Sequence, residues 1–116
     1  MTHPYLLIDP FEKTITPVYY DGDFHSIYNL IDCSCFDVVR CGKYDLFVDD
    51  EGLFKDDQSF FLVFDYPQPL AGKALVVGCD EEGNTIEPGI TIEELEARLL
   101  WVDGVLWVDG VLWEDE

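Results

Sequence analysis

The sequence predicts an α+β fold, a single compact domain in which a mainly antiparallel sheet is packed by one or two short helices. Three observations favour this class. Short runs rich in β-branched and aromatic residues recur between turn residues, as strands do. Only two stretches have the spacing of an amphipathic helix, and they do not alternate regularly with the strands, as parallel βαβ units would. The length of 116 residues suits one domain.

The N-terminal segment is expected to form a strand pair and then a helix. Residues 5–9 and 14–20 are the predicted strands, joined by a turn from Pro10 to Lys13. In the following run, DGDFHSIYNLID, Asp23 is the predicted N-cap. Apolar residues then recur at the i, i+3, i+4, i+7 spacing of one buried helix face. They are Phe24, Ile27, Tyr28 and Ile31.

The middle of the chain is expected to be mostly strand. Residues 35–41 and 43–50 predict two strands around a glycine turn. The apolar run SFFLVF predicts another strand, which ends in a proline-rich loop because proline cannot donate to a ladder. KALVVGCD is a candidate for a buried strand, and EEGN at 81–84 is a hairpin turn.

A second helix is expected after residue 90. Thr91 and Glu94 have the T-x-x-E spacing of a capping box, which opens the run IEELEARLL. The apolar residues predicted to share one face of this helix are Ile92, Leu95, Leu99 and Leu100.

The chain divides into a domain at 1–100 and a β-prone, tryptophan-rich tail at 101–116, which repeats WVDGVL in tandem. A continued helix is disfavoured, because a six-residue step turns the helix by roughly 240° and scatters the tryptophans. Asp-Gly turns at 103–104 and 109–110 favour a meander instead. Its predicted pairs are Val102 with Val105, Trp101 with Leu106, Val108 with Val111, and Trp107 with Leu112. Alternatively, the repeat is a slippage duplication without a selected role.

The formal net charge is −19, and 18 of the 25 acidic residues lie within 49–116. Such a field argues against direct binding of DNA or RNA, which needs Lys and Arg to displace counterions, and against anionic membranes. It speeds association with basic protein surfaces instead. The candidate partner-binding residues are Asp49, Asp50, Glu51, Asp56, Asp57, Asp80, Glu81, Glu82, Glu93, Glu94, Glu96, Trp101, Trp107, Trp113, Glu114, Asp115 and Glu116.

The residues that could carry catalysis or bind a metal form no strong motif. Cys33, Cys35 and Cys41 lack the spacing of zinc knuckles. A catalytic pair of a thiol with His25 would also need an orienting carboxylate, and carboxylates are so common in this chain that their presence indicates nothing. The acidic turns lack the full calcium-loop pattern, and no phosphate-binding glycine loop or nucleophile elbow occurs. We therefore expect no catalytic residues, no metal, no cofactor and no enzymatic activity.

A cytoplasmic location is expected. The N-terminal run MTHPYLLIDP has no basic region and too short an apolar stretch for a signal peptide. No segment approaches the roughly 20 apolar residues of a membrane span. The four cysteines are then expected to be free thiols.

Two stretches carry a family resemblance, DLFVDDEGLFKDDQSFF and YPQPLAGKALVVGCDEEGNTIEPGITIEELEARLL. With IYNLID and FDVVR before them, they resemble domain of unknown function 3846 over about residues 5–100. The most specific block runs from Pro69 to Glu82. The resemblance implies a place in phages, plasmids or conjugative elements and carries over no catalytic residues. The tail after Leu100 departs from the usual end of the family.

The leading functional hypothesis is a non-enzymatic inhibitor that occupies a basic nucleic-acid site of a host protein as an acidic mimic. The first alternative is a general protein-interaction module that uses the tryptophan tail. The second is a protein that sequesters a small ligand or nucleotide near a basic residue, Arg40 or Lys73. An exposed apolar tail also allows self-association through strand pairing.

Overall fold

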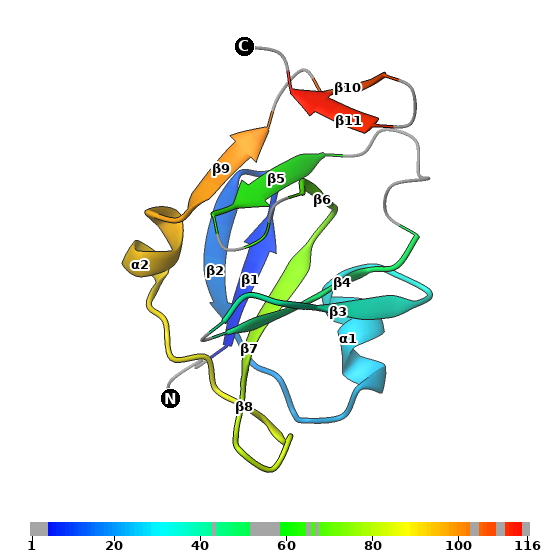
Figure 1. Ribbon diagram of the computed structural model, residues 1–116. Coiled ribbons are helices and arrows are strands. Elements are labelled where there is room, and N and C mark those ends of the chain that lie inside the picture. The colour runs from blue at the N-terminus through cyan, green and yellow to red at the C-terminus, as the bar shows by residue number, and fades with distance from the viewer. Residues whose placement is uncertain are drawn as a thin grey trace.

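The computed structural model describes residues 5–42, 44–51, 59–64, 66 and 68–102, and the backbone of two strands at 105–108 and 111–114. The strands form three antiparallel sheets, and two short helices accompany them (Figure 1), which confirms the α+β class. In chain order the elements are β1 (Tyr5–Asp9), β2 (Thr14–Val18), α1 (His25–Leu30), β3 (Phe36–Arg40), β4 (Asp45–Asp49), β5 (Phe60–Val63), β6 (Leu70–Ala71), β7 (Ala74–Cys79), β8 (Thr85–Ile86), α2 (Ile92–Glu96), β9 (Leu99–Val102), β10 (Val105–Val108) and β11 (Val111–Glu114).

The largest sheet has the order β2-β1-β7-β4-β3, and β8 pairs with the end of β7. Its central strand β7 is apolar at nearly every position because it is covered on both faces. Ala74 and Val76 belong to one cluster of buried side chains, while Leu75 and Val77 belong to a second. The alternation of side chains along a strand thus accounts for the unbroken apolar run of β7.

Different elements cover the two faces of this sheet. The first buried cluster includes Phe61 and Val63 of β5 and Leu95 of α2, so the three-stranded sheet β6-β5-β9 and α2 pack on that side. The second cluster includes Ile27 of α1 and its C-terminal neighbour Ile31. The central sheet therefore lies between two smaller layers, and each layer has its own core.

The first helix differs from its prediction at the N-terminus. It begins at His25, with Phe24 at the N-cap position. Asp23 still accepts a bond, from the backbone N of His25 to Oδ1 at 3.0 Å, in a turn just before the helix. Phe24 is 52% exposed and lies off the buried face, whereas Ile27 and Ile31 are buried as predicted.

The second helix is shorter than predicted. Its capping box is present, with Glu94 N donating to Thr91 Oγ1 and Thr91 N donating to Glu94 Oε1. However, the helix ends at Glu96, and Leu99 and Leu100 belong to strand β9. Pairing of β9 with β5 here outweighs the helix propensity of the ARLL run.

Strand β9 crosses the position at which the sequence divides into domain and tail. Trp101 and Val102 pair with Phe61 and Phe60 of β5. Strands β9 and β10 belong to different sheets, so the predicted pairs of Trp101 with Leu106 and of Val102 with Val105 are wrong. The second predicted ribbon is confirmed, because β10 pairs with β11 in the expected register, Trp107 opposite Leu112 and Val108 opposite Val111. The repeat therefore contributes one strand to the domain and two to a separate ribbon.

Candidate functional site

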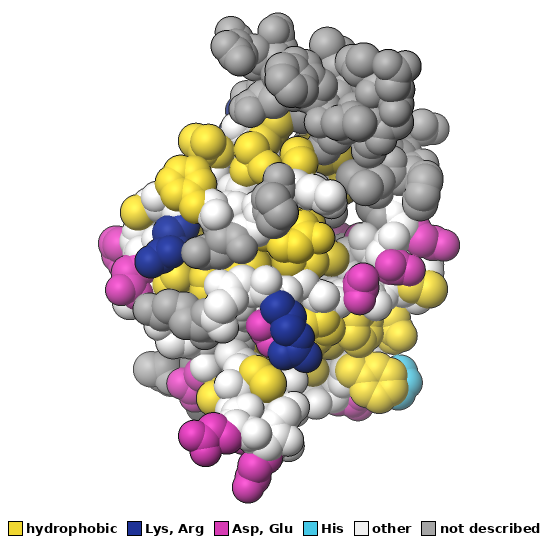
Figure 2. All heavy atoms as spheres, in the orientation of Figure 1, with side chains coloured by type: hydrophobic (Ala, Val, Ile, Leu, Met, Phe, Trp, Pro, Cys, Tyr) yellow, Lys and Arg dark blue, Asp and Glu magenta, His cyan; other side chains and the backbone are white. Residues whose placement is uncertain are grey.

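The predicted partner-binding carboxylates that the structure describes occupy three separate parts of the molecule. Asp50 and its neighbours follow β4, Glu82 lies in the turn between β7 and β8, and Glu93 lies on α2 (Figure 1). Figure 2 shows acidic side chains on opposite sides of the view and at the tip of the β7–β8 hairpin. The fold therefore does not gather them into one acidic array.

At the end of β4, one of the three predicted carboxylates is not on the surface. Asp49 is only 8% exposed, and its Oδ1 accepts a bond from the backbone N of Glu51 at 2.9 Å. The expectation that Asp49 is a surface carboxylate is therefore wrong, because this side chain forms the turn. Asp50 and Glu51 are exposed, and Asp50 N donates to the carbonyl of Cys35 at 3.0 Å.

A hollow of about 150 Å³ lies next to this turn. Asp37 of β3 borders it together with Asp49 and Asp50, and Tyr66 and Gln68 add polar groups. The remaining wall is mostly apolar and consists of Val39, Val48, Pro69, Leu70 and Ala71. The arrangement combines carboxylates with an apolar wall, which suits a side chain with an aliphatic stem and a cationic end.

Asp37 is the residue of this hollow that the sequence reasoning missed. It lies opposite Val48 in the β3–β4 ladder, and its Oδ1 accepts a bond from the backbone N of Val38 at 2.8 Å. The ladder places the side chain on the same face as Val48, a neighbour of the hollow. Pairing the two predicted strands in register would have placed Asp37 beside Val48, and so on the face of the sheet that borders the hollow.

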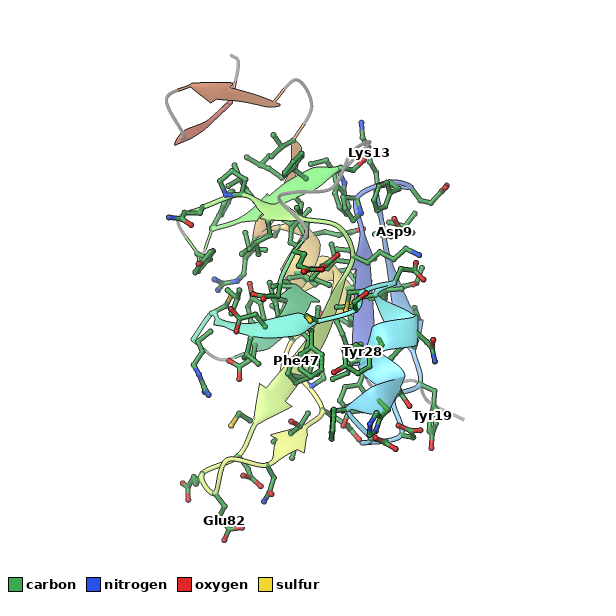
Figure 3. All side chains as sticks on the ribbon, turned by 90° about the vertical axis from the view of Figure 1, so that its right-hand side faces the viewer. Asp9, Lys13, Tyr19, Tyr28, Phe47 and Glu82 are labelled. Carbon is green, nitrogen blue, oxygen red and sulfur yellow. The ribbon has the colours of Figure 1, made fainter. Side chains whose placement is uncertain are left out.

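The acidic turn between β7 and β8 is held by its first carboxylate. Asp80 Oδ1 accepts bonds from the backbone N of Glu82 at 2.9 Å and of Asn84 at 2.8 Å. The bonds from Asn84, followed by those from Glu82 and Gly83, lower the pKa of Asp80 below its usual value. Gly83 adopts a positive φ of 89°, as the predicted turn requires. Glu82 projects from the tip (Figure 3).

Helix α2 carries the third group of carboxylates. Glu93 and Glu96 are exposed, while Glu94 is engaged in the capping box. A carboxylate in the first turn of a helix is favoured by the unpaired backbone N–H groups there. Stabilisation of the helix is therefore sufficient to explain Glu93 and Glu94.

The tryptophans and terminal acids are only partly described. Trp101 is half-buried and packs against the main core cluster, so it contributes to the fold and not to a free contact surface. The other predicted positions lie outside the residues whose side chains the structure describes: Asp56, Asp57, Trp107, Trp113, Glu114, Asp115 and Glu116.

His25 and the cysteines were the residues considered for thiol catalysis or metal binding. His25 stacks on Phe24 with ring centroids 4.3 Å apart, and its Nδ1 lies 3.0 Å from Asp23 Oδ1. Hydrogen bonds from His25, first from its backbone N, lower the pKa of Asp23. All four cysteines are free thiols. Among the described residues, no group of three or more His, Cys, Asp or Glu side chains could hold a metal ion.

A second hollow, of about 400 Å³, is lined by Arg40, Gly42, Tyr44, Asp45 and Cys79. Arg40 Nη1 lies 3.7 Å from Asp45 Oδ2, so its charge is partly balanced. Lys73, the other basic candidate, donates to Asp32 Oδ2 at 2.7 Å, and this bond raises its pKa. Arg40 is therefore the better placed of the two basic residues for contact with a small anion.

Neither helix in the described ranges is long and apolar enough to cross a membrane.

Comparisons with known proteins indicate the family. Residues 1–100 match the model of a domain of unknown function, DUF3846. The uncharacterized protein y4iR of Sinorhizobium fredii (strain NBRC 101917 / NGR234) is 39% identical over 70 residues, and the match covers 59% of this chain and 43% of that relative. No solved structure matches the chain significantly. Because the family model covers most of its length, the chain belongs to the DUF3846 family.

Proposed function

We propose that this protein is a non-enzymatic accessory protein of a mobile element, a phage or plasmid, that binds a basic surface of a host protein. Carboxylates would take the place of phosphates at a nucleic-acid site, in an anti-defence role. The net charge of −19 supports a basic partner. The mobile-element context rests on where proteins of this family are expected to occur. The cytoplasm is the expected place of action.

The observation that carries the proposal is the hollow between β3, the end of β4 and β6. Asp37 and Asp50 are exposed on its border, and Val39 and Leu70 contribute to its apolar wall. A lysine or arginine side chain could lay its stem along that wall and place its charged end between the carboxylates. Charge-assisted hydrogen bonds of this kind are roughly twice as strong as neutral ones.

The separation of the acidic groups limits which of them can contact one partner surface. The groups at β4, at the β7–β8 turn and on α2 point in different directions (Figure 2), so one flat partner surface would engage mainly one of them. Of the three, the β4 group borders a hollow with an apolar wall. We therefore place partner binding at Asp37, Asp50 and Glu51, with the other carboxylates contributing a long-range field.

The test is capture of host proteins from a lysate by the immobilised full chain, at low salt and at roughly 0.5 M salt. We expect nucleic-acid-binding proteins that high salt releases, because salt screens exposed charges. A variant with Asp37→Asn and Asp50→Asn should lose them, whereas the control with Glu81→Gln and Glu82→Gln removes the same charge and should retain them. Each captured protein is then purified and tested for competition between this chain and duplex DNA. Captured proteins whose nucleic-acid binding is unaffected would contradict the proposal.

The tryptophan tail gives the same experiment a second arm. Binding through the tail should persist at high salt and disappear when the tail is removed. Since β9 ends at Val102, the truncated chain should end there and not at Leu100, which would cut β9 in half. Salt-resistant capture that this truncation abolishes would favour a general interaction module.

The hollow at Arg40 favours a second candidate function, sequestration of a small anionic ligand such as a nucleotide. Arg40 is exposed, and its hollow is the larger of the two described above. A ligand that binds only the folded protein raises its Tm. Thermal unfolding with a panel of nucleotides, for the parent and for Arg40→Gln, tests this: stabilisation should appear in the parent and vanish in the variant.

A further inference from the structure

Strand β9 occupies an edge position beside β5, and that position has clear requirements. Leu99 lies opposite Val63, and Val102 lies opposite Phe60. Leu99 and Val102 are 8% and 7% exposed, while Leu100 is 48% exposed. Trp101 packs half-buried against the main core. The position is therefore a strand-binding site that takes a buried apolar residue, an unrestricted residue, a tryptophan and a second buried apolar residue.

The chain contains two further segments of nearly the same sequence. Residues 99–102 read LLWV, residues 105–108 read VLWV, and residues 111–114 read VLWE. An Asp-Gly pair separates each from the next, so the repeat is six residues long. A six-residue shift preserves which side chains face the core, because side chains alternate along a strand with a period of two.

The second segment meets the requirements of the site and the third does not. Val105 would replace Leu99 at a buried position, a loss of one methylene, which corresponds to a preference of roughly fourfold for the observed strand at about 0.8 kcal/mol. The other three residues are identical. In the third segment Glu114 would take the position of Val102 and would lose its hydration on burial.

We propose that the site beside β5 accepts residues 105–108 of the same chain in exchange for residues 99–102. In the exchanged form, residues 99–104 become a loop that follows α2. Lengthening a surface loop by a few residues has a small entropic cost. The inference is independent of the proposed function, because it concerns only which segment of the repeat completes the three-stranded sheet.

The exchange separates β10 from β11. Phe64 N donates to the carbonyl of Arg98 at 2.8 Å, so the alternate positions 100 and 102 direct their backbone groups toward β5. Their equivalents after a six-residue shift are 106 and 108. Val108 lies opposite Val111 in the ribbon and cannot pair fully with both strands. The lost ribbon is a two-stranded sheet, a structure that is only marginally stable in water by itself.

The test compares three variants of the full chain. Leu99→Glu puts a carboxylate at a buried position of the observed strand, and exchange should rescue it, so Tm should fall by less than about 5 °C. Leu99→Glu with Val105→Glu blocks both segments, and Tm should fall by at least about 10 °C more. Leu99→Glu with Val111→Glu adds the same second charge outside the rescuing segment and should behave like the single variant.

Amide hydrogen exchange gives a direct reading of the occupant. In Leu99→Glu, protection should disappear from residues 100 and 102 and appear at 106 and 108. Equal destabilisation of the single variant and the Leu99→Glu, Val105→Glu variant, or a single variant that does not fold, would overturn the proposal. So would rescue that weakens on dilution, since the segment would then come from a second copy. Leu99→Ala with and without Val105→Ala repeats the comparison without added charge. There too, only a larger fall in Tm for the double variant than for Leu99→Ala supports exchange.

Discussion

Two acidic turns of this protein look alike in sequence and differ in what lies behind them. One is the DDE run at 49–51, which begins with the last residue of β4, and the other is the DEEGN run at 80–84 after β7. In both, the first aspartate accepts a bond from the backbone N two residues later, at 2.9 Å for Asp49 and at 2.9 Å for Asp80. The first carboxylate of each turn therefore has the same structural role.

The acidic residues that follow this first aspartate differ in their surroundings. Asp50 borders a hollow that has an apolar wall, whereas Glu82 projects from the tip of a hairpin (Figure 3). An ion pair between fully exposed partners contributes little, because water and salt screen it and the side chains lose freedom. The comparison indicates that an acidic residue becomes a useful binding group when the fold places apolar surface next to it, and that the number of acids in a turn does not reveal this.

The largest effect is expected from Gly78→Ala, which should disturb one turn and leave the other intact. A Cβ at Gly78 would lie 2.5 Å from the backbone oxygen of Glu87, so β7 and the chain after β8 must move apart. The free energy of unfolding should fall by about 1–3 kcal/mol. Urea unfolding measures this. Binding of a Lys- and Arg-rich peptide to the folded variant should be unchanged; a parallel loss of binding would show that the two turns are not independent.

The next largest effect is expected from reversing single charges. Asp50→Lys places a cation on the border of the hollow and should weaken binding of the same peptide by about tenfold, or 1.4 kcal/mol. Glu81→Lys makes the same change of charge at the other turn and should weaken binding by less than about twofold through the long-range field. Titration calorimetry at low and high salt measures both. Equal effects would mean that only net charge matters and that the hollow has no role.

Much of the fold could be predicted because local signals agreed with the tertiary structure. The capping box at Thr91 and Glu94 formed as predicted, and Gly83 provides the positive φ of the β7–β8 turn. The apolar run of β7 predicted a buried strand, which is the central strand of the sheet. Each of these features depends on residues within a few positions of one another.

The wrong predictions concern residues whose structure depends on pairing between strands that are distant in the sequence. Leu99 and Leu100 continue a helical pattern, but they form a strand because they pair with β5, some forty residues earlier in the chain. Asp49 reads as a surface residue in an acidic run, yet it is buried at the end of a strand that is covered on both faces. Asp37 joins the hollow only through the β3–β4 ladder. Residue type and local spacing contain none of this information.

The smallest effect is expected from the pH dependence of the β7–β8 turn. Hydrogen bonds from Asn84, Glu82 and Gly83 lower the pKa of Asp80 below 3.8 in the folded protein. A lowered pKa stabilises the fold above the unfolded pKa, and that stabilisation is lost as the pH falls through the folded pKa. Asp80→Asn keeps an Oδ1 acceptor but has no charge. The stability difference between the parent and Asp80→Asn should therefore be present at about pH 5 and shrink toward about pH 3.

Glu82→Gln removes a charge from the tip without removing these bonds, so urea unfolding across the same pH range should show a much weaker trend. If Glu82→Gln gives the same trend as Asp80→Asn, the pH dependence comes from the net charge and not from the hydrogen bonds to Asp80.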